Sequence, residues 1–404
     1  MSDGMGREFT YLSSHATNRY FIPNWGIYNK MRQKTIVYFN SGFFDTDITV
    51  VKELQKEYIV HWYVILGPRE PYKKDFFFDF IKGSNIQLHL TEFNCRRRSL
   101  KFCSIIHKCL KEIKQIRPSL IYTCHIDLFF PIFYKLYLSN IPLIIGIHDV
   151  KPHSSYNLPL PLKWAISLNI KLATEIVLFS RNQYHLFSRL HPKIKANYVG
   201  MSMKDFGSPT ISCSPLKDKI KILFFGTLHK YKGPDLLIEA FEQLIDEGIN
   251  NLELSFYGKP SDDDYRNECL NKIKHPQFYN LHLKFIENED IPNIFNSHHL
   301  TIFPYRDATQ SGPLMINVRY SLPIIAPHIA CFSDIYNNIN AIFYNDSNNI
   351  QELKEALKKV SQLTIEDYMK LKNSCNILKE KYSEASIANN YIKVFNRIID
   401  EYNY

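Results

Sequence analysis

The chain has 404 residues, more than one hydrophobic core usually supports, and its 45% hydrophobic and 22% charged residues are an ordinary globular composition, so two domains are expected. The formal net charge of +9 favours anionic partners such as nucleotides, an anionic membrane surface or nucleic acid. Because no zinc finger, RNA-binding sheet motif or long basic tail is present, nucleic acid is excluded from the expected partners.

Residues 1–33 show no clear periodicity and lack the basic-then-apolar pattern of a secretory signal, so they are interpreted as an N-terminal extension. Eight cysteines are scattered along the chain without a CxxC pair or a metal-like cluster. This pattern predicts reduced thiols, no metal site and a cytoplasmic location. The most apolar helical candidate, 126–145, contains Pro131 and Pro142, which favours a core helix and strand over a membrane span.

From Thr35 onward the sequence alternates strand and helix patterns. The strand TIVYFN is followed by a turn at Ser41 and Gly42, and further apolar runs are IVHWYVI, SLIYTCH, PLIIGIH and EIVLFS. Helices are expected near 47–56, 99–117, 127–139 and 161–172. Continuous apolar runs suit parallel strands buried on both faces. We therefore predict an N-terminal Rossmann-like, acceptor-binding domain over 34–208.

A segment rich in Ser, Pro and Gly, 205–217, is the predicted linker, and the alternation restarts after it with IKILFFG, LELSFYG, LHLKFIE, LTIFPY, PIIAP and AIFYN. These runs predict a second Rossmann-like domain over 209–383 that binds the nucleotide sugar. The final helix, 384–404, carries apolar residues at helical spacing and is expected to pack back onto a domain. The predicted fold is α/β, with two Rossmann-like domains facing a central cleft.

The most informative stretch is KIKILFFGTLHKYKGPDLLIEAF, 219–241. It predicts a buried strand, a basic loop bracketed by Gly226 and Gly233, and a helix that opens on Pro234. The positive end of that helix and Lys232 would point at one spot, which favours a bound anion such as a diphosphate. An ordinary βα turn that happens to carry glycine and lysine is the alternative interpretation.

A second loop of the same kind lies in LTIFPYRDATQSGPLMINVRYSLPIIAP, 300–327. Gln310, Ser311 and Gly312 precede a predicted helix, so their amides and side chains could donate to the same phosphates. Simple capping of that helix by Ser311 is the alternative. Two loops at the carboxyl ends of strands in one parallel sheet can converge on one ligand.

His148, which ends PLIIGIH, and Asp149 and His153 after it belong to the candidate acceptor side, together with Ser41 and Gly42. His148 and Asp149 come at a carboxyl end that would face the cleft, and His153 follows four residues later. His148 could donate to a sugar hydroxyl or tune a reacting oxygen. A structural histidine explains the same spacing.

Two segments suggest contact with an anionic membrane. The stretch 96–117 places apolar residues on one stripe and Arg and Lys largely elsewhere, as an interfacial helix does. The phenylalanines of DFFFDFI, 75–81, could insert into lipid. An ordinary surface helix and core phenylalanines are the competing interpretations.

The chain resembles glycosyltransferase family 4, the retaining enzymes of GT-B architecture, over roughly 35–400. The residues that carry the resemblance are FFGTLHKYKGPDLLIEAF, FPYRDATQSGPL with the following PIIAP, and IGIHDVKPH. The resemblance implies that Lys232 holds the donor diphosphate, that Thr227 stands where the commonest arginine would be, and that His229 occupies an alternative arginine position. The TQSG motif resembles that of a subgroup that often lacks the family's paired glutamates.

Those glutamates would align with Ala308 and Ile316, and Asp307 is the nearest carboxylate that could substitute for the first of them. The resemblance further implies that His148 lies near the transferred sugar and that the backbone near Phe285 and Ile286 meets the nucleotide base.

The expected function is transfer of a sugar from a nucleotide diphosphate sugar, as donor substrate and without a cofactor or metal, to a saccharide or lipid-linked acceptor in surface polysaccharide biosynthesis. Fixed positive groups would replace a metal in stabilising the departing diphosphate. Two alternatives stay open. One is a sugar-nucleotide epimerase of similar fold, and the other is a non-catalytic homologue that binds a nucleotide sugar.

Overall fold

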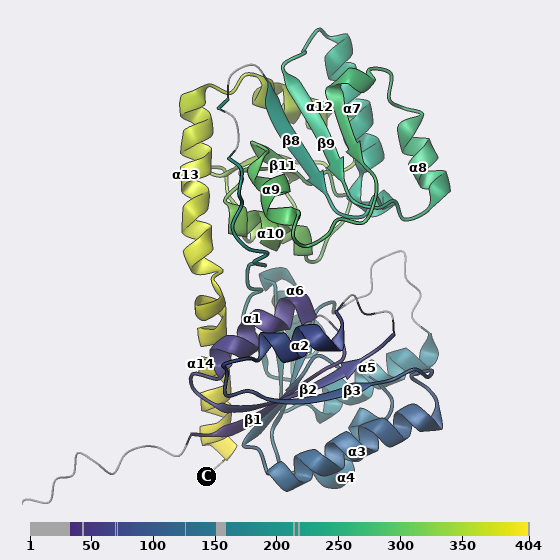
Figure 1. Ribbon diagram of the computed structural model, residues 1–404, viewed down its shortest axis with the longest axis vertical. Coiled ribbons are helices and arrows are strands. Elements are labelled where there is room, and N and C mark those ends of the chain that lie inside the picture. The colour runs from purple at the N-terminus through teal and green to yellow at the C-terminus, as the bar shows by residue number, and fades with distance from the viewer. Residues whose placement is uncertain are drawn as a thin grey trace, which may run out of the picture. The chain divides into compact units, whose positions relative to one another are not determined.

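The computed structural model describes residues 33–402, apart from 43, 69, 71, 126, 151–158, 213–214 and 217–218. The residues from Lys34 onward form one compact unit, shown in Figure 1. The predicted extension, 1–33, lies outside the described residues except for its last position. Among the described residues, no helix is long and apolar enough to cross a membrane, and seven cysteines are free thiols.

The first half of the chain forms a seven-stranded sheet in which every pair of neighbours is parallel. Its strands are β1 (Thr35–Asn40), β2 (Ile59–Leu66), β3 (Gln87–Glu92), β4 (Leu120–Thr123), β5 (Leu143–Ile147), β6 (Glu175–Leu178) and β7 (Ala196–Tyr198). The strand order is β3-β2-β1-β4-β5-β6-β7. The direction of winding therefore reverses between β1 and β4, where ligands of such sheets collect.

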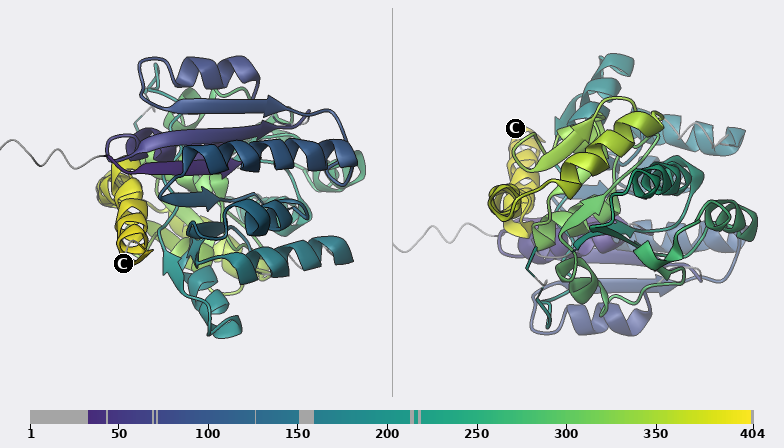
Figure 2. Two further views of the ribbon diagram at one scale, coloured as in Figure 1. Left: turned by 90° about the horizontal axis from the view of Figure 1, so that it is seen from below. Right: turned by 90° about the horizontal axis from the view of Figure 1, so that it is seen from above.

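Helices connect these strands and lie on both faces of the sheet, as the end-on views of Figure 2 show. They are α1 (Phe44–Leu54), α2 (Lys74–Phe80), α3 (Leu100–Ile116), α4 (Phe130–Tyr137), α5 (Leu160–Leu172) and α6 (Arg181–Leu190). The central strand β1 is almost fully buried, as its apolar run predicted.

The second half repeats the plan with a six-stranded parallel sheet of order β10-β9-β8-β11-β12-β13. Its strands are β8 (Ile220–Phe225), β9 (Leu252–Tyr257), β10 (Tyr279–His282), β11 (Leu300–Ile302), β12 (Ile324–Pro327) and β13 (Ala341–Tyr344). Here the winding reverses between β8 and β11. The predicted fold class, α/β with two Rossmann-like halves, is confirmed.

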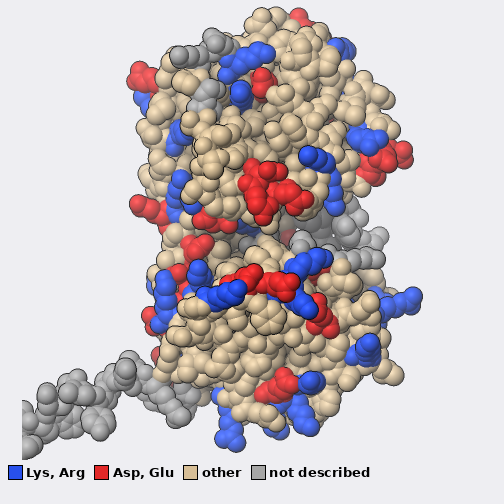
Figure 3. All heavy atoms as spheres, viewed as in Figure 1, with Lys and Arg blue, Asp and Glu red and all other residues tan. Residues whose placement is uncertain are grey.

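The helical elements of the second half follow in chain order. They are η1 (Lys230–Lys232), α7 (Pro234–Asp246), α8 (Asp263–Leu270), η2 (Pro276–Phe278), α9 (Ile291–Asn296), α10 (Gly312–Tyr320), α11 (Ala330–Ser333), α12 (Ile350–Ser361), α13 (Ile365–Lys381) and α14 (Glu384–Tyr402). On the face shown in Figure 3, Lys and Arg are scattered among Asp and Glu, so the positive net charge forms no continuous basic band there.

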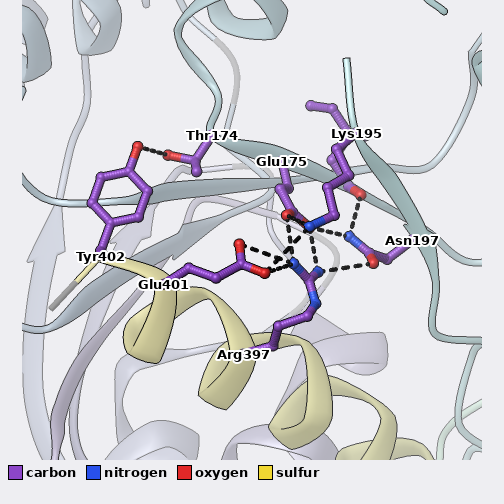
Figure 4. A network of polar contacts seen from close by, with 8 residues as sticks. Thr174, Glu175, Lys195, Asn197, Arg397, Glu401 and Tyr402 are labelled. Atoms are coloured by element: carbon purple, nitrogen blue, oxygen red, sulfur yellow. Dashed lines mark hydrogen bonds and ion pairs between the residues drawn. The ribbon is translucent and has the colours of Figure 1, made fainter. Parts of the chain in front are cut away.

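The last helix, α14, follows the second sheet in sequence but packs on the first sheet. The rings of Tyr391 and Phe395 lie 5.5 and 5.7 Å from that of Tyr122 in β4. Arg397 donates to both carboxylate oxygens of Glu175 in β6, at 2.8 and 2.6 Å, within the polar network of Figure 4. The predicted apolar stripe of this helix is therefore buried against the half of the chain that lies farther away in sequence.

Candidate functional site

The candidate site lies at the switch point of the second sheet, where the loops after β8 and β11 leave adjacent strands. Gly233 shows how closely these two loops approach. Its φ is +65°, and a Cβ atom there would lie 2.0 Å from the carbonyl oxygen of Pro304. Only glycine tolerates both the left-handed backbone and this contact. Gly233 is therefore required where the two loops pack against each other.

The predicted lysine of this loop is buried. Lys232 is only 8% exposed, and burial lowers the pKa of its ammonium from 10.5 to about 8. Its Nζ lies 5.9 and 5.8 Å from the ring centroids of Tyr231 and Tyr305. A Cβ atom on Gly226 would approach this Nζ to 2.8 Å, so the glycine leaves room for the ammonium.

Among the described residues, no carboxylate forms an ion pair with Lys232, although one lies three positions along the chain. Asp235 instead binds Arg306, whose two terminal nitrogens donate to its oxygens at 2.8 and 2.7 Å. Burial alone would raise the pKa of Asp235, but these bonds and one from Tyr265 lower it below its usual value. The ammonium is therefore left without a neutralising partner at a place built from two loops, which suits an anionic ligand.

Arg306 also fastens the two loops to each other. Its NH1 donates to the carbonyl oxygen of Lys230 at 2.5 Å, and its backbone N–H donates to that of Tyr231 at 2.7 Å. The sequence interpretation missed Arg306 and Asp235 as a pair. The arginine follows FPY directly, yet its partner lies 71 positions away.

The second loop contributes helix α10 and contacts to the first half. The Ser311 side chain accepts a hydrogen bond from the backbone N–H of Leu314 at 3.3 Å, so it caps this helix. The Gln310 amide donates to the carbonyl oxygen of His148 at 2.7 Å, and the Thr309 hydroxyl donates to Asp149 at 2.5 Å. A Cβ atom on Gly312 would meet only the end of a flexible lysine side chain. These bonds hold the second loop against the loop that follows β5.

The structure places the candidate acceptor-side residues at the carboxyl ends of β1 and β5. His148 is half-buried, with its ring 4.4 Å from that of Phe179, and Asp149 is exposed. Ser41 is buried, while beside Gly42 the space for a Cβ atom is empty. The candidate His153 lies outside the described residues.

The remaining candidates lie in the loops that follow β8, β10 and β11. Thr227 and His229 are half-buried, the latter with its ring 5.0 Å from Tyr231. Asp307 is exposed, and so is Phe285, at 58%, whereas Ile286 is half-buried against an apolar cluster.

The two positions aligned with the family's glutamates are apolar and buried. Ala308 is 7% exposed and Ile316 is 6% exposed. Ile316 belongs to a cluster that includes Phe225 and Phe295. A carboxylate there would be desolvated without a partner in that cluster, so the surroundings match the residues present. Within the described ranges, no group of three or more His, Cys, Asp or Glu side chains could hold a metal ion.

Comparison with known proteins gives three findings. Residues 219–362, which contain the candidate loops, match a family model described as "Glycosyl transferases group 1". A curated relative, an "uncharacterized 41.2 kDa protein in cps region" of Klebsiella pneumoniae, is 21% identical over 183 residues, which are 44% of this chain and 47% of that protein. The match thus spans about half the length of the relative.

Two solved structures are similar over nearly their whole length. Anabaena HepE in complex with UDP and glucose is 14% identical, with a TM-score of 0.67, and the match covers 90% of this chain and 99% of that one. The catalytic domain of starch synthase IV from Arabidopsis thaliana, bound to ADP and acarbose, is 13% identical, with a TM-score of 0.68 and coverage of 91% and 99%. These likenesses show the GT-B fold, and the family-model match supports a glycosyltransferase.

Proposed function

We propose that this protein is a glycosyltransferase that moves a sugar from a nucleotide diphosphate sugar to a saccharide or lipid-linked saccharide acceptor. The observation that carries the proposal is the buried Lys232 ammonium, which has no carboxylate partner in the part of the chain that the structure describes. It lies within the segment that matches the glycosyltransferase model, where two loops meet at the switch point of the second sheet.

The chemistry follows from charge that develops on the leaving group. As the bond between sugar and diphosphate breaks, negative charge grows on the diphosphate oxygens. With a pKa of about 8, Lys232 is mostly protonated at neutral pH, and an ammonium in a site of low dielectric stabilises that charge strongly. The backbone amides of Ser311 and Gly312, at the positive end of α10, would add to this stabilisation.

The roles of the other candidates belong to the same proposal. The family resemblance puts His148 near the transferred sugar and favours retention of its anomeric configuration. Thr227 and His229 would line the diphosphate, and Phe285 and Ile286 the base. The hydrogen bond from Gln310 to the carbonyl of His148 supports one shared site, because it ties the proposed donor loop to the proposed acceptor loop.

Surface polysaccharide synthesis is the proposed context, supported by the Klebsiella relative's description as a protein of a cps region.

Peripheral contact with the inner face of the cell membrane is part of the proposal. In the predicted lipid-contacting segment of α2, Phe76 and Phe78 are 38% and 50% exposed, whereas Phe77 is fully buried. Helix α3 buries its apolar stripe, which includes Phe102 and Ile106, in the core and leaves its lysines outside.

Donor binding is the direct test. Thermal melting of the full chain is measured with UDP, ADP, GDP and dTDP, and a bound nucleotide raises the midpoint by mass action. We expect at least one of these to stabilise the wild type and to lose its effect in Lys232→Ala. Lys230→Ala is the matched control, because that side chain is exposed on the same loop. Equal protection of wild type and Lys232→Ala would contradict the proposal.

Turnover separates an enzyme from a binding homologue. The protein is incubated with the stabilising nucleotide sugar, first alone and then with saccharide acceptors, and the products are analysed. Sugar transfer supports the proposal. An isomerised donor without acceptor would identify an epimerase, and binding without any product across a broad acceptor panel would identify a non-catalytic homologue.

A further inference from the structure

The first sheet has a switch point of its own, and a cluster of polar side chains occupies it. Ser41 directly follows β1, and His125 lies just beyond the end of the neighbouring strand β4. The imidazole Nδ1 of His125 is hydrogen-bonded to the Ser41 hydroxyl, and its Nε2 binds the carboxylate of Asp127. The three residues are 5%, 2% and 6% exposed. Such a buried polar cluster, at the place where ligands collect, marks a candidate site.

The negative charge of Asp127 is compensated inside this cluster. Its Oδ1 accepts hydrogen bonds from the backbone N–H groups of Phe129 and Phe130, at 2.5 and 2.7 Å. Burial alone would raise the pKa of Asp127, but His125 and these bonds lower it below its usual value. The carboxylate therefore stays ionised and fully partnered, and it does not neutralise cations nearby.

Two cationic side chains, Arg97 and Arg98, line the same cavity as Asp127. The Arg97 guanidinium donates to the Ser41 carbonyl oxygen at 3.0 Å and to the Ser41 hydroxyl at 3.3 Å, and it lies 5.6 Å from the ring centroid of Phe93. These contacts orient it while leaving further N–H groups available. In the part of the chain that the structure describes, neither Arg97 nor Arg98 forms an ion pair with a carboxylate. An oriented Arg97 guanidinium beside the unengaged one of Arg98, both without counterions among the described residues, suits a phosphate.

A cavity of about 210 Å³ lies against these groups. Arg97, Arg98 and Asp127 form its polar side, and Leu128, Leu162 and Ala165 form an apolar wall. Few polar groups are available for the many hydroxyls of a sugar. The lining therefore favours a ligand that joins an anionic group to a hydrocarbon rather than an acidic saccharide.

The apolar wall continues onto the outside of α5. Leu160, Trp164 and Leu168 on this helix are 70%, 73% and 42% exposed. The helix contains no acidic residue, and its two lysines, Lys163 and Lys171, are exposed. Exposed aliphatic and indole side chains beside lysines are typical of helices that contact a lipid surface. The sequence suggests this role for 75–81 and 96–117, with core phenylalanines and an ordinary surface helix as the alternatives.

We propose that the cavity at the first switch point binds the phosphate of a lipid phosphate, with Arg97 and Arg98 on the phosphate and the hydrocarbon chain against Leu162 and the outer face of α5. Ser41 orients Arg97 through two hydrogen bonds and is itself held by His125, which Asp127 binds in turn. This inference rests on the proposed function, since it names the acceptor as a lipid-linked phosphate whose saccharide would face the donor site.

Calorimetric titration of the full chain with dodecyl phosphate, kept below its micellar concentration, tests the site. We expect wild-type binding, and a loss of affinity of about tenfold for each arginine removed in Arg98→Gln and in Arg97→Gln/Arg98→Gln. Arg96→Gln is the matched control, an exposed neighbour outside the cavity. Arg98→Gln carries weight on its own because this side chain makes no hydrogen bond among the described residues, so the variant should fold normally.

Inorganic phosphate and dodecanol separate the two parts of the ligand. We expect each to bind more weakly than dodecyl phosphate, and Leu162→Gln to weaken dodecyl phosphate while leaving inorganic phosphate unchanged. Equal affinities for inorganic and dodecyl phosphate would overturn the lipid part, and equal binding of dodecyl phosphate to wild type and both arginine variants would overturn the site. UDP binding should persist in every variant, so failure of the donor site would show separately as a wild type that binds dodecyl phosphate but no nucleotide.

Discussion

Replacement of Lys232 by methionine should raise stability while it lowers activity. Burial moves the pKa of Lys232 from 10.5 to about 8, and this difference corresponds to a cost of about 3 kcal/mol for holding the charge in the folded protein at pH 7. Contacts with the Tyr231 and Tyr305 rings, at nearly 6 Å, return about 1 kcal/mol. Lys232→Met should therefore be more stable by about 2 kcal/mol.

The stability gain depends on pH with a defined sign. Below about pH 8 the wild-type lysine is charged in both states, and the cost is fully present. Between about pH 8 and 10.5 the folded state loses this proton while the unfolded state keeps it, so the stability contribution of Lys232 rises with pH. The advantage of Lys232→Met should shrink over that window, which urea melts at several pH values would follow.

Activity should move in the opposite direction. Loss of one preorganised donor to the leaving diphosphate lowers turnover by about two to three orders of magnitude. In the wild type, kcat/KM should fall as the pH rises through about 8, because only the ammonium form of Lys232 stabilises the diphosphate. Lys230→Met should change neither quantity. A Lys232→Met variant that is less stable than wild type at pH 7, or that keeps full activity, would refute the reasoning.

Three further changes test contacts that hold the site and the fold together. Gly233→Ala should destabilise the protein by about 3 kcal/mol or more in urea melts and weaken donor binding, because its Cβ would lie 2.0 Å from the Pro304 carbonyl oxygen; a neutral effect would mean that the two loops do not approach so closely. Ser311→Ala should cost about 1 kcal/mol through loss of the α10 cap, and Ser311→Thr should restore most of it. Arg397→Met should cost about 2 to 3 kcal/mol at pH 7, because it removes the hydrogen bonds that, together with those of Asn197 and Lys195, outweigh burial and hold the pKa of Glu175 below its usual 4.5. This last cost should disappear as the pH falls well below 4.5, and a pH-independent cost would point to lost packing instead.

The fold and the central lysine could be predicted from the sequence because both depend on local order. Continuous apolar runs separated by helical stretches are enough to indicate parallel strands, and the repetition of that pattern indicates two halves. The loop around Lys232 and Gly233 is contiguous, so one short segment of sequence shows its glycines, its charge and the helix that follows. Burial of Ile387 and Tyr391 in the last helix likewise follows from helical spacing.

Partners distant in sequence could not be predicted in this way. An apolar stripe requires burial but does not name the surface that covers it, so only the structure shows that α14 lies on β4 through Tyr391 and Phe395. The pairing of Arg306 with Asp235, and of Ser41 with His125, depends on which strands are neighbours in each sheet. Strand order is a property of the whole chain's packing and leaves no local signal.

Which side chains are exposed is likewise decided by tertiary structure and not by local sequence. The sequence by itself determined that the chain forms two parallel α/β halves and that a glycine-bracketed lysine ends one of the strands, because neighbouring residues carry that information. Only tertiary packing decided that Phe77 is buried while Trp164 is exposed, that the Lys232 ammonium has no counterion among the described residues, and that two arginines border an apolar cavity. Each of these outcomes depends on which distant segments pack over a side chain, and such packing is a long-range property of the fold.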